Sequence, residues 1–584
     1  MLVSLMVCGL WAAGAGLPAN VDVTVRHGVV FFCPDKPEDA VRELEKIKAD
    51  GFRLIEFASW VWTIPKPGSD VEKRAQAVLD WCDRNDLGFF LMHNIQWGSV
   101  GDGGGLDKQV LNPAETAPLL EDWARVLKGH KCVLGVILGN EVGPSLGTPA
   151  DAPRLWGEFR GWLAGKHGTI ARLNEAWKTN WRSFDDVTVP PKDSPGWIDC
   201  RRYANERFGA FYGYLIRHDL RPLLGEKLYG EKTSLDPFVH MACRGNTMTC
   251  WDDLLAMYPL WQIKCAADTA GKSMFNSELH LYNDDYGYAP SINKSLYRYL
   301  TSAMLGEYLS ASFAWGMWKK PEIATIHKAT PASIGETERI APWMKLLAAG
   351  YEAADVAVVV TENNYATPSD VAVETDWEPR HPLGLLYAHL ATLGRPWRYV
   401  IDEDVHEVTR GTVVLWSAGL REDVAKAMVA LPAEVKVLAV ESVPERDEYG
   451  RALDAALVER LRKRAKVVSL EGLAAAVGVE AGLPEEYRRV AMVKYPWWGP
   501  ERGSYDFDLP YCSLEARHVD LREGRLVAVV NNTETAQTAP VPWAEGIARG
   551  RHVEDLRAGT ELSVTDAARQ EFGPLAVRLY LCKP

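Results

Sequence analysis

A chain of 584 residues is too long for a single hydrophobic core and predicts two to four domains. Its hydrophobic content of 47% and charged content of 24% are ordinary for a globular protein. A net charge of −13 without a run of Lys or Arg argues against nucleic acid as a partner. Beyond the apolar N-terminal stretch, no segment is apolar for long enough to predict a membrane span.

The N-terminal stretch, residues 1–20, is apolar and ends in small residues, MLVSLMVCGLWAAGAGLPAN. This pattern predicts a cleaved signal peptide and a secreted or periplasmic protein. Ten Cys are spread along the chain without CxxC pairs or a Cys/His cluster at zinc spacing. The sequence therefore predicts no metal and no other cofactor, and it favours buried thiols such as Cys132 and Cys250 as small core residues.

Residues 25–350 alternate short apolar runs with amphipathic helical patterns. The helices are predicted at Pro37–Asp50, Asp70–Asn85, Ala114–Lys128, Ala150–Gly165, Ile170–Lys178 and Tyr203–His218. The strands are predicted at His27–Phe32, Phe52–Phe57, Gly88–His93, Val133–Leu138, Lys227–Glu231, Thr247–Trp251, Ser273–Asn276 and Ala311–Trp315. Eight such units predict an α/β fold with a (β/α)8 TIM barrel, and a doubly wound open sheet is the alternative.

The remaining chain predicts two smaller domains. Residues 351–490 alternate strands, beginning with Val356–Val360, with helices such as the one in GLLYAHLATLG, as in a doubly wound α/β domain. Residues 491–584 lack long helical patterns and contain runs such as LVAVVNNT and LAVRLYLC. These runs indicate a small C-terminal antiparallel β domain.

Two carboxylates follow predicted barrel strands, Glu141 after strand four and Glu278 after strand seven. The carboxyl ends of barrel strands carry the chemistry of this fold, so we expect the two acids to face each other across a pocket. A facing pair of carboxyl groups is what cleavage of a glycosidic bond requires. The alternatives are a helix N-cap role for Asn140 and Glu141 and a surface position for Glu278.

Several other residues are candidates for substrate binding. Arg53 is expected to meet a carboxylate, either the nucleophile or, in a structural ion pair, Glu56 or another acid. His93 ends strand three, where it could bond sugar hydroxyls or serve as a core histidine. The other predicted substrate-binding residues are Asn140, Tyr258, Trp315 and Trp318. The excess of Trp, 22 in all, is typical either of core filling or of a sugar site lined by indole rings.

These residues resemble glycoside hydrolase clan A, whose members are retaining barrels with Asn-Glu after strand four and Glu after strand seven. More specifically, ARLNEAWKTNWRSFDDVTVPP (Ala171–Pro191) is similar to the stretch after strand four in family 42 β-galactosidases. The domain that begins ADVAVVV resembles that family's amidotransferase-like second domain, and the β-rich tail fits its third domain.

The resemblance implies a retaining exo-acting β-glycosidase with Glu141 as acid/base and Glu278 as nucleophile, supported by Asn140 and Arg53. It implies an oligosaccharide or polysaccharide substrate, and a trimer. The chain departs from the family at Gly139, at Leu279-His280-Leu281 and in lacking the family's zinc-binding Cys cluster. The resemblance makes β-galactosidase the expected activity, and the departures at Gly139 and Leu279-His280-Leu281, beside the reacting sugar, make a β-mannosidase or β-glucosidase the rival on the same scaffold. A non-catalytic carbohydrate-binding protein is the alternative from another class.

Overall fold

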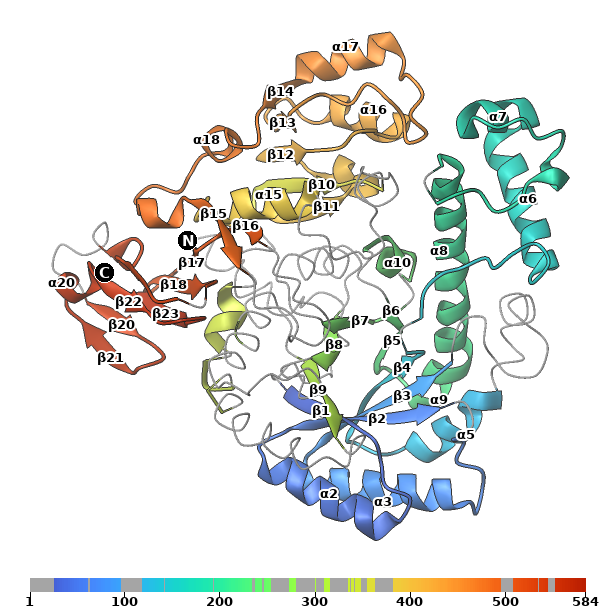
Figure 1. Ribbon diagram of the computed structural model, residues 1–584. Coiled ribbons are helices and arrows are strands. Elements are labelled where there is room, and N and C mark those ends of the chain that lie inside the picture. The colour runs from blue at the N-terminus through green and yellow to red at the C-terminus, as the bar shows by residue number, and fades with distance from the viewer. Residues whose placement is uncertain are drawn as a thin grey trace.

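One sheet of parallel strands closes on itself in the first half of the chain (Figure 1). The strands are β1 (Arg26–Phe31), β2 (Leu54–Trp60), β3 (Gly88–Asn94), β4 (Val133–Leu138), β5 (Leu228–Gly230), β6 (Lys232–Thr233), β7 (Met248–Asp253), β8 (Ser273–Leu279) and β9 (Leu309–Trp315). β5 and β6 are two segments of one strand, interrupted at Glu231. The first segment pairs with β4 and the second with β7, so the barrel has eight strands and no open edge.

The computed structural model describes 26–60, 63–95, 118–140, 142–192, 194–233, 237–243, 246–253, 273–279, 300, 309–315, 335–336, 338–340, 342–347, 354–362, 382–494, 508–533, 535–544 and 552–583. Closure of the parallel sheet confirms the predicted (β/α)8 barrel and excludes the doubly wound alternative for this part of the chain. None of the helices in these ranges is long and apolar enough to cross a membrane.

Alternation along the strands sorts the barrel's side chains into two layers. The interior is filled by a cluster that includes Val30, Leu54, Phe90, Ile137 and Phe275. Residues one position away, such as Val29, Ile55, Phe89 and Val136, belong instead to the core between strands and helices. This parity decides which polar side chains face the barrel axis.

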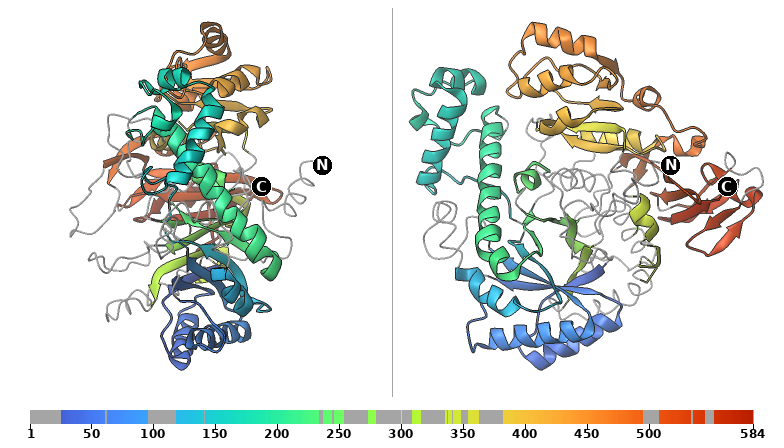
Figure 2. Two further views of the ribbon diagram at one scale, coloured as in Figure 1. Left: turned by 90° about the vertical axis from the view of Figure 1, so that its right-hand side faces the viewer. Right: turned by 180° about the vertical axis from the view of Figure 1, so that it is seen from behind.

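Helices lie beside the barrel, whereas α6 and α7 lie farther out, at the end of α8 that is remote from the strands (Figures 1 and 2). They are α2 (Pro37–Ala49), α3 (Asp70–Asn85), α5 (Pro118–Leu127), α6 (Pro153–His167), α7 (Ile170–Trp177), α8 (Gly196–Tyr214), α9 (Arg221–Leu224) and α10 (Pro237–Ala242). Ser69 caps α3 by accepting the N–H of Glu72, and Thr169 caps α7 by accepting the N–H of Arg172. α8 continues into a π-helical turn over Leu215–Leu220.

The second sheet is parallel, with the order β11-β10-β12-β13-β14. Its strands are β10 (Val356–Val360), β11 (Arg398–Ile401), β12 (Thr412–Leu415), β13 (Lys436–Val440) and β14 (Ala465–Val468). Its helices are α15 (Pro382–Ala391), α16 (Glu422–Ala430), α17 (Ala455–Arg464) and α18 (Leu473–Val477). The sheet lies above the barrel in Figure 1.

The end of the chain is built from antiparallel strands. They are β15 (Val490–Lys494), β16 (Asp508–Cys512), β17 (Leu514–Leu521), β18 (Gly524–Asn531), β19 (Gln537–Ala539), β20 (Val553–Asp555), β21 (Thr560–Leu562), β22 (Gln570–Phe572) and β23 (Val577–Cys582), with the short helix α20 (Val564–Ala567). The buried carboxylate of Glu515 in β17 joins these strands to the helices of the second sheet. Arg517 Nε donates to Glu515 Oε1 at 2.6 Å, and the Tyr387 hydroxyl of α15 donates to Glu515 Oε2 at 3.2 Å.

Asp199 of α8 ties the helices that follow β4 to the second sheet. Its fully buried carboxylate accepts hydrogen bonds from the Lys166 ammonium at 2.6 Å and the His167 ring at 2.9 Å. It also accepts from the Trp177 indole of α7 and from the Tyr449 hydroxyl, each at 2.8 Å. Tyr449 lies between β13 and α17, so one carboxylate joins three helices to the second sheet's connections.

Ionisation of Asp199 should contribute to stability in a pH-dependent way. Burial opposes ionisation, but the hydrogen bond from His167 and the charge of Lys166 outweigh it and hold the pKa of Asp199 well below its usual range. Because the folded pKa is depressed, this stabilisation is present above the unfolded pKa of about 3.9. It is lost as the pH falls through the folded pKa.

We predict that Asp199→Asn lowers the free energy of unfolding by about 3 kcal/mol at pH 7, because charged donors lose their buried partner. The measurement is urea unfolding followed by circular dichroism. The difference from wild type should shrink as the pH is lowered below about 4. Asp185→Asn is the matched control, since Asp185 is an exposed acid in the segment between α7 and α8. Equal losses in both variants would refute the role given to Asp199.

Candidate active site

The carboxyl end of β4 is aligned with the end of the next barrel strand. Val142 forms a parallel bridge with Thr233, and its N–H donates to the Lys232 carbonyl oxygen at 3.0 Å. Asn140 and Val142 flank Glu141, which is not among the residues that the structure describes. The contacts of Asn140 and Val142 therefore assign these two neighbours to the rim formed by the carboxyl ends of β4 and β6.

Glu278 lies in β8, and its Cα is paired with that of Asp252 in β7. The register on both sides of β8 shifts between Asn276 and Leu279, as a β-bulge produces. Bulges commonly re-aim side chains beside active sites. The backbone of Glu278 thus lies near the carboxyl end of its strand, while its side chain falls outside the described part.

Three polar residues from neighbouring strands meet at the end of β4. The backbone N–H of Asn140 donates to the Oδ1 atom of Asn94, which ends β3, at 3.1 Å. The Asn140 Oδ1 atom in turn accepts a hydrogen bond from the Lys232 Nζ atom of β6 at 2.7 Å. Asn94 and Lys232 are buried, whereas Asn140 is partly exposed. Asn140 is thus the member of this group that can reach a ligand.

Gly139 creates the turn that delivers Asn140. Its φ of +82° is a backbone conformation that residues with a Cβ rarely adopt. A Cβ there would lie 2.8 Å from Val142 Cγ1 and 2.9 Å from the Tyr212 hydroxyl oxygen. That hydroxyl is fixed, because it donates to the Ile95 carbonyl at 2.9 Å. Glycine is therefore required here by both the backbone and the space.

By strand alternation His93 lies outside the barrel interior, which favours the core-histidine alternative over a bond to sugar hydroxyls. Parity places it with Phe89 and Leu91, in the layer beneath α5, and its ring centroid is 6.2 Å from that of Trp123. Its Nδ1 atom is hydrogen-bonded to the Ser59 hydroxyl at 3.3 Å. Burial lowers its pKa to about 4, which keeps the ring neutral. Its Nε2 atom is buried and has no hydrogen-bond partner among the described residues, so His93 is a core histidine that is satisfied at one ring nitrogen only.

Arg53 also differs from the expected supporting role. It directly precedes β2, at the amino end of the barrel, opposite to the rim. Its side chain is 43% exposed and its Nε atom lies 3.5 Å from the Glu338 carboxylate. The structural ion pair, with an acid other than Glu56, is therefore what forms. Since parallel strands place their two ends on opposite faces, Arg53 cannot support a nucleophile at the carboxyl rim.

The other predicted aromatic residues are placed only in part. Trp315 is the last residue of β9 and is paired with Phe31 of β1, which puts its backbone at the barrel rim. Its side chain is not described, and neither Tyr258 nor Trp318 falls within the described ranges.

Sequence reasoning missed Lys232 and Asn94. The expected fifth strand ended at Glu231, one residue short of Lys232. Period-two alternation through Leu228 and Gly230 would have placed Lys232 on the interior face. Asn94 directly follows His93, so the same alternation would have turned Asn94 toward the barrel interior and His93 away from it. Asn94 would then have been the candidate for the site in place of His93.

One group within the described residues brings metal-ligand types together: Asp83, His130 and Cys132. His130 Nδ1 is hydrogen-bonded to Asp83 Oδ2 at 2.7 Å, and His130 Nε2 to Gln76 Nε2 at 2.8 Å. Asp83 Oδ1 accepts the backbone N–H of Cys132 at 2.7 Å. Both ring nitrogens therefore have protein partners, and the group serves as a hydrogen-bonded link between α3 and the start of β4.

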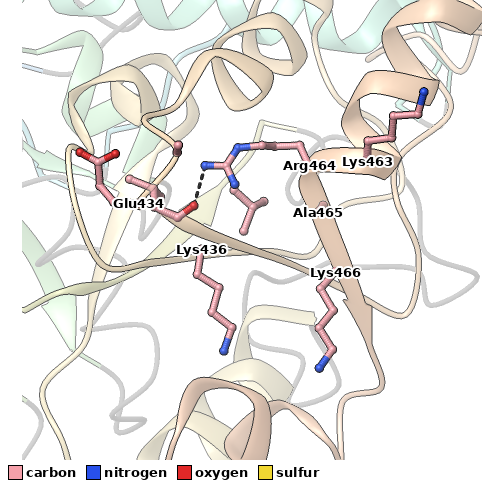
Figure 3. A pocket seen from close by; sticks show the side chains of 9 residues that line it. Glu434, Lys436, Lys463, Arg464, Ala465 and Lys466 are labelled. Carbon is pink, nitrogen blue, oxygen red and sulfur yellow. Dashed lines mark hydrogen bonds between the residues drawn. The ribbon is translucent and has the colours of Figure 1, made fainter.

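A groove of about 370 Å³ lies on the second sheet rather than at the barrel rim (Figure 3). It is formed at the amino ends of β13 and β14, with Lys436, Lys463 and Lys466 in its lining. Arg464 donates to the carbonyl oxygen of Pro432 at 2.7 Å and also to that of Val435. No carboxylate pair lines this groove, so it does not fit the chemistry predicted for the chain.

We predict that Gly139→Ala lowers the free energy of unfolding by about 2 kcal/mol, because backbone strain and crowding against Tyr212 add. Gly129→Ala is the matched control: Gly129 has a φ of +88°, but no atom lies within 4 Å of the place that a Cβ would take. It should cost only the strain of about 1 kcal/mol. Urea unfolding measures both, and equal losses would show that the space around Gly139 contributes nothing.

Comparison with known sequences places a family signature beside this site. The family model described as β-galactosidase of glycoside hydrolase family 42 matches residues 113–211. A β-galactosidase of Thermus thermophilus is 36% identical over 146 residues, and BgaA, a β-galactosidase of a Thermus species, is 30% identical over 146 residues. Each alignment covers 23% of this chain and 22% of the relative's length.

Solved structures resemble nearly the whole chain. Gan42B, a family 42 β-galactosidase of G. stearothermophilus, has a TM-score of 0.66 at 13% identity, over 96% of this chain and 99% of that one. The cold-adapted β-galactosidase of Rahnella sp. R3 has a TM-score of 0.69 at 13% identity, over 97% and 99%. At such identity the likeness concerns the fold.

Taken together, the local sequence match and the shared fold agree with the resemblance seen in Ala171–Pro191, which lies inside the matched region. The chain therefore has the architecture of the family 42 β-galactosidases and carries that family's sequence signature in residues 113–211.

Proposed function

We propose that this protein is a retaining exo-acting β-glycosidase that releases terminal β-linked galactose from an oligosaccharide or polysaccharide. The observation that carries the proposal is the barrel rim, where the segment Asn140–Val142 after β4 and Glu278 in β8 belong to one closed parallel sheet. The sequence similarity to β-galactosidases supports the choice of reaction.

The two acids have distinct proposed roles. Glu278 attacks the anomeric carbon while Glu141 protonates the leaving oxygen, which forms a covalent glycosyl-enzyme. Glu141 then removes a proton from water, and the water releases the sugar with its β configuration retained. This chemistry requires carboxyl groups about 5–5.5 Å apart. Asn140 supplies a hydrogen bond to the hydroxyl beside the reacting carbon.

Substrate choice is tested with aryl β-galactoside, β-mannoside, β-glucoside and β-fucoside. We expect kcat/KM to be highest for the β-galactoside, since β-galactosidase is the activity named for the relatives. A preference for the β-mannoside or β-glucoside would keep the mechanism but change the sugar. Turnover of none of the four would overturn the proposal.

The roles of the acids are tested by substitution. Glu141→Ala and Glu278→Ala should each lower kcat by a factor of about 10³ or more, because each removes a group that acts in the transition state. Azide should restore turnover in both, giving the inverted α-glycosyl azide with Glu278→Ala and the β-glycosyl azide with Glu141→Ala. Product anomers are measured by NMR.

Glu175→Ala is the control, because Glu175 is an exposed acid on α7. It should leave kcat unchanged. Near-normal turnover in either active-site variant would contradict the assignment.

We also propose the finer features that the resemblance implies. Residues 351–490 form an amidotransferase-like domain, for which the strand order of the parallel second sheet is support. Residues 491–584 form a C-terminal β domain, residues 1–20 are a signal peptide, and the protein assembles as a trimer. Light scattering should give a mass three times that of the 65.0 kDa chain, less any cleaved peptide. A monomer mass would contradict the trimer.

A further inference from the structure

Lys232 is an unusual residue for its position. Its side chain has no exposed surface, although lysine is among the residues least often fully buried. Its Cα is paired with that of Cys250, which belongs to the interior cluster, so Lys232 faces the barrel axis, and its Nζ atom lies 2.7 Å from Asn140 Oδ1. A buried ammonium at the rim of a barrel requires strong partners, so its placement calls for a functional reason.

The chemistry of the ammonium group decides how the Asn140 amide is turned. A carboxamide has one end that only accepts hydrogen bonds and one end that only donates. The lysine ammonium has three donors and no acceptor, so it can face only the carbonyl oxygen. With Oδ1 held by Lys232, the Nδ2 group must point elsewhere, and within the described residues no protein partner of Nδ2 is found.

The backbone on both sides of Glu141 is held as well. The Asn140 N–H is bonded to Asn94, and the Val142 N–H is bonded to the carbonyl oxygen of Lys232 itself. One residue of β6 therefore contacts this segment through both its main chain and its side chain. The position of Asn140 and the orientation of its amide are fixed independently.

We propose that Lys232 is a positioning residue, which locks the Asn140 amide with its N–H donors toward the sugar hydroxyl next to the anomeric carbon. This inference rests on the proposed glycosidase function and adds a determinant of specificity to the same site. Asn140 then acts only as a donor, so a substrate without that hydroxyl loses the contact. Such contacts strengthen as the transition state forms.

The test compares an aryl β-galactoside with its 2-deoxy analogue through the ratio of their kcat/KM values. Wild type should favour the parent by about 10²-fold or more, as sites built to bond a hydroxyl do. Lys232→Met should lower that ratio about tenfold, because the amide is free to turn. Asn140→Ala should lower it similarly, and the double variant should be no worse than Asn140→Ala alone.

Matched variants separate positioning from general damage. Lys232→Arg keeps a donor-only cation and should retain most of the ratio, whereas Lys232→Gln, which can also accept, should not. Lys227→Met is the control: Lys227 lies just before the same strand and donates to the Val133 carbonyl at 2.7 Å, at the amino end. It should leave the ratio unchanged. Circular dichroism checks folding, and Lys232→Gln decides the matter if Lys232→Met does not fold.

The outcomes are distinct. If wild type is active and its ratio of kcat/KM values is unchanged by Lys232→Met or Lys232→Gln, the role of Lys232 is overturned. Additive losses of that ratio in the double variant would overturn it too. Either result would leave the glycosidase function intact. A wild type that hydrolyses no aryl glycoside would overturn the proposed function and this inference with it.

Discussion

Closure of the parallel sheet is the constraint on which the site depends. Because all eight strands run in one direction, every strand end belongs to one of two faces, and residues remote in sequence share a rim. The pairing of Val142 with Thr233, and of Asp252 with Glu278, follows from that closure. A shift of one residue in register would turn Lys232 out of the interior and separate it from Asn140.

The family-specific segment has a structural role in this framework. Asn174 of α7 holds the following turn, since its Nδ2 donates to the Trp181 carbonyl and its Oδ1 accepts the Trp181 N–H, both at 2.8 Å. Trp177 donates its indole N–H to Asp199. The motif that makes the family recognisable therefore helps to attach α6–α8 to the second sheet, and it does so some distance along the chain from the acids.

Periodicity makes the barrel predictable, and the same periodicity explains where residue-level inference fails. The predicted strand positions are correct to within a few residues, but the prediction does not assign interior and exterior faces along them. It therefore favours His93 over Asn94, although neighbours in a strand face opposite ways. It favours Arg53 for its charge between apolar residues, whereas a position before β2 lies at the wrong end of the barrel.

The sequence by itself determined the alternating barrel units, the two candidate acids near the ends of predicted strands and the segment shared with family 42, because these depend on local composition and spacing. Tertiary structure decided the rest. Only the register between β4 and β6 brings Lys232 to Asn140, and only packing brings Tyr449 to Asp199. Such contacts join residues far apart in the chain, and no local pattern encodes them, because each depends on how two separate elements are aligned.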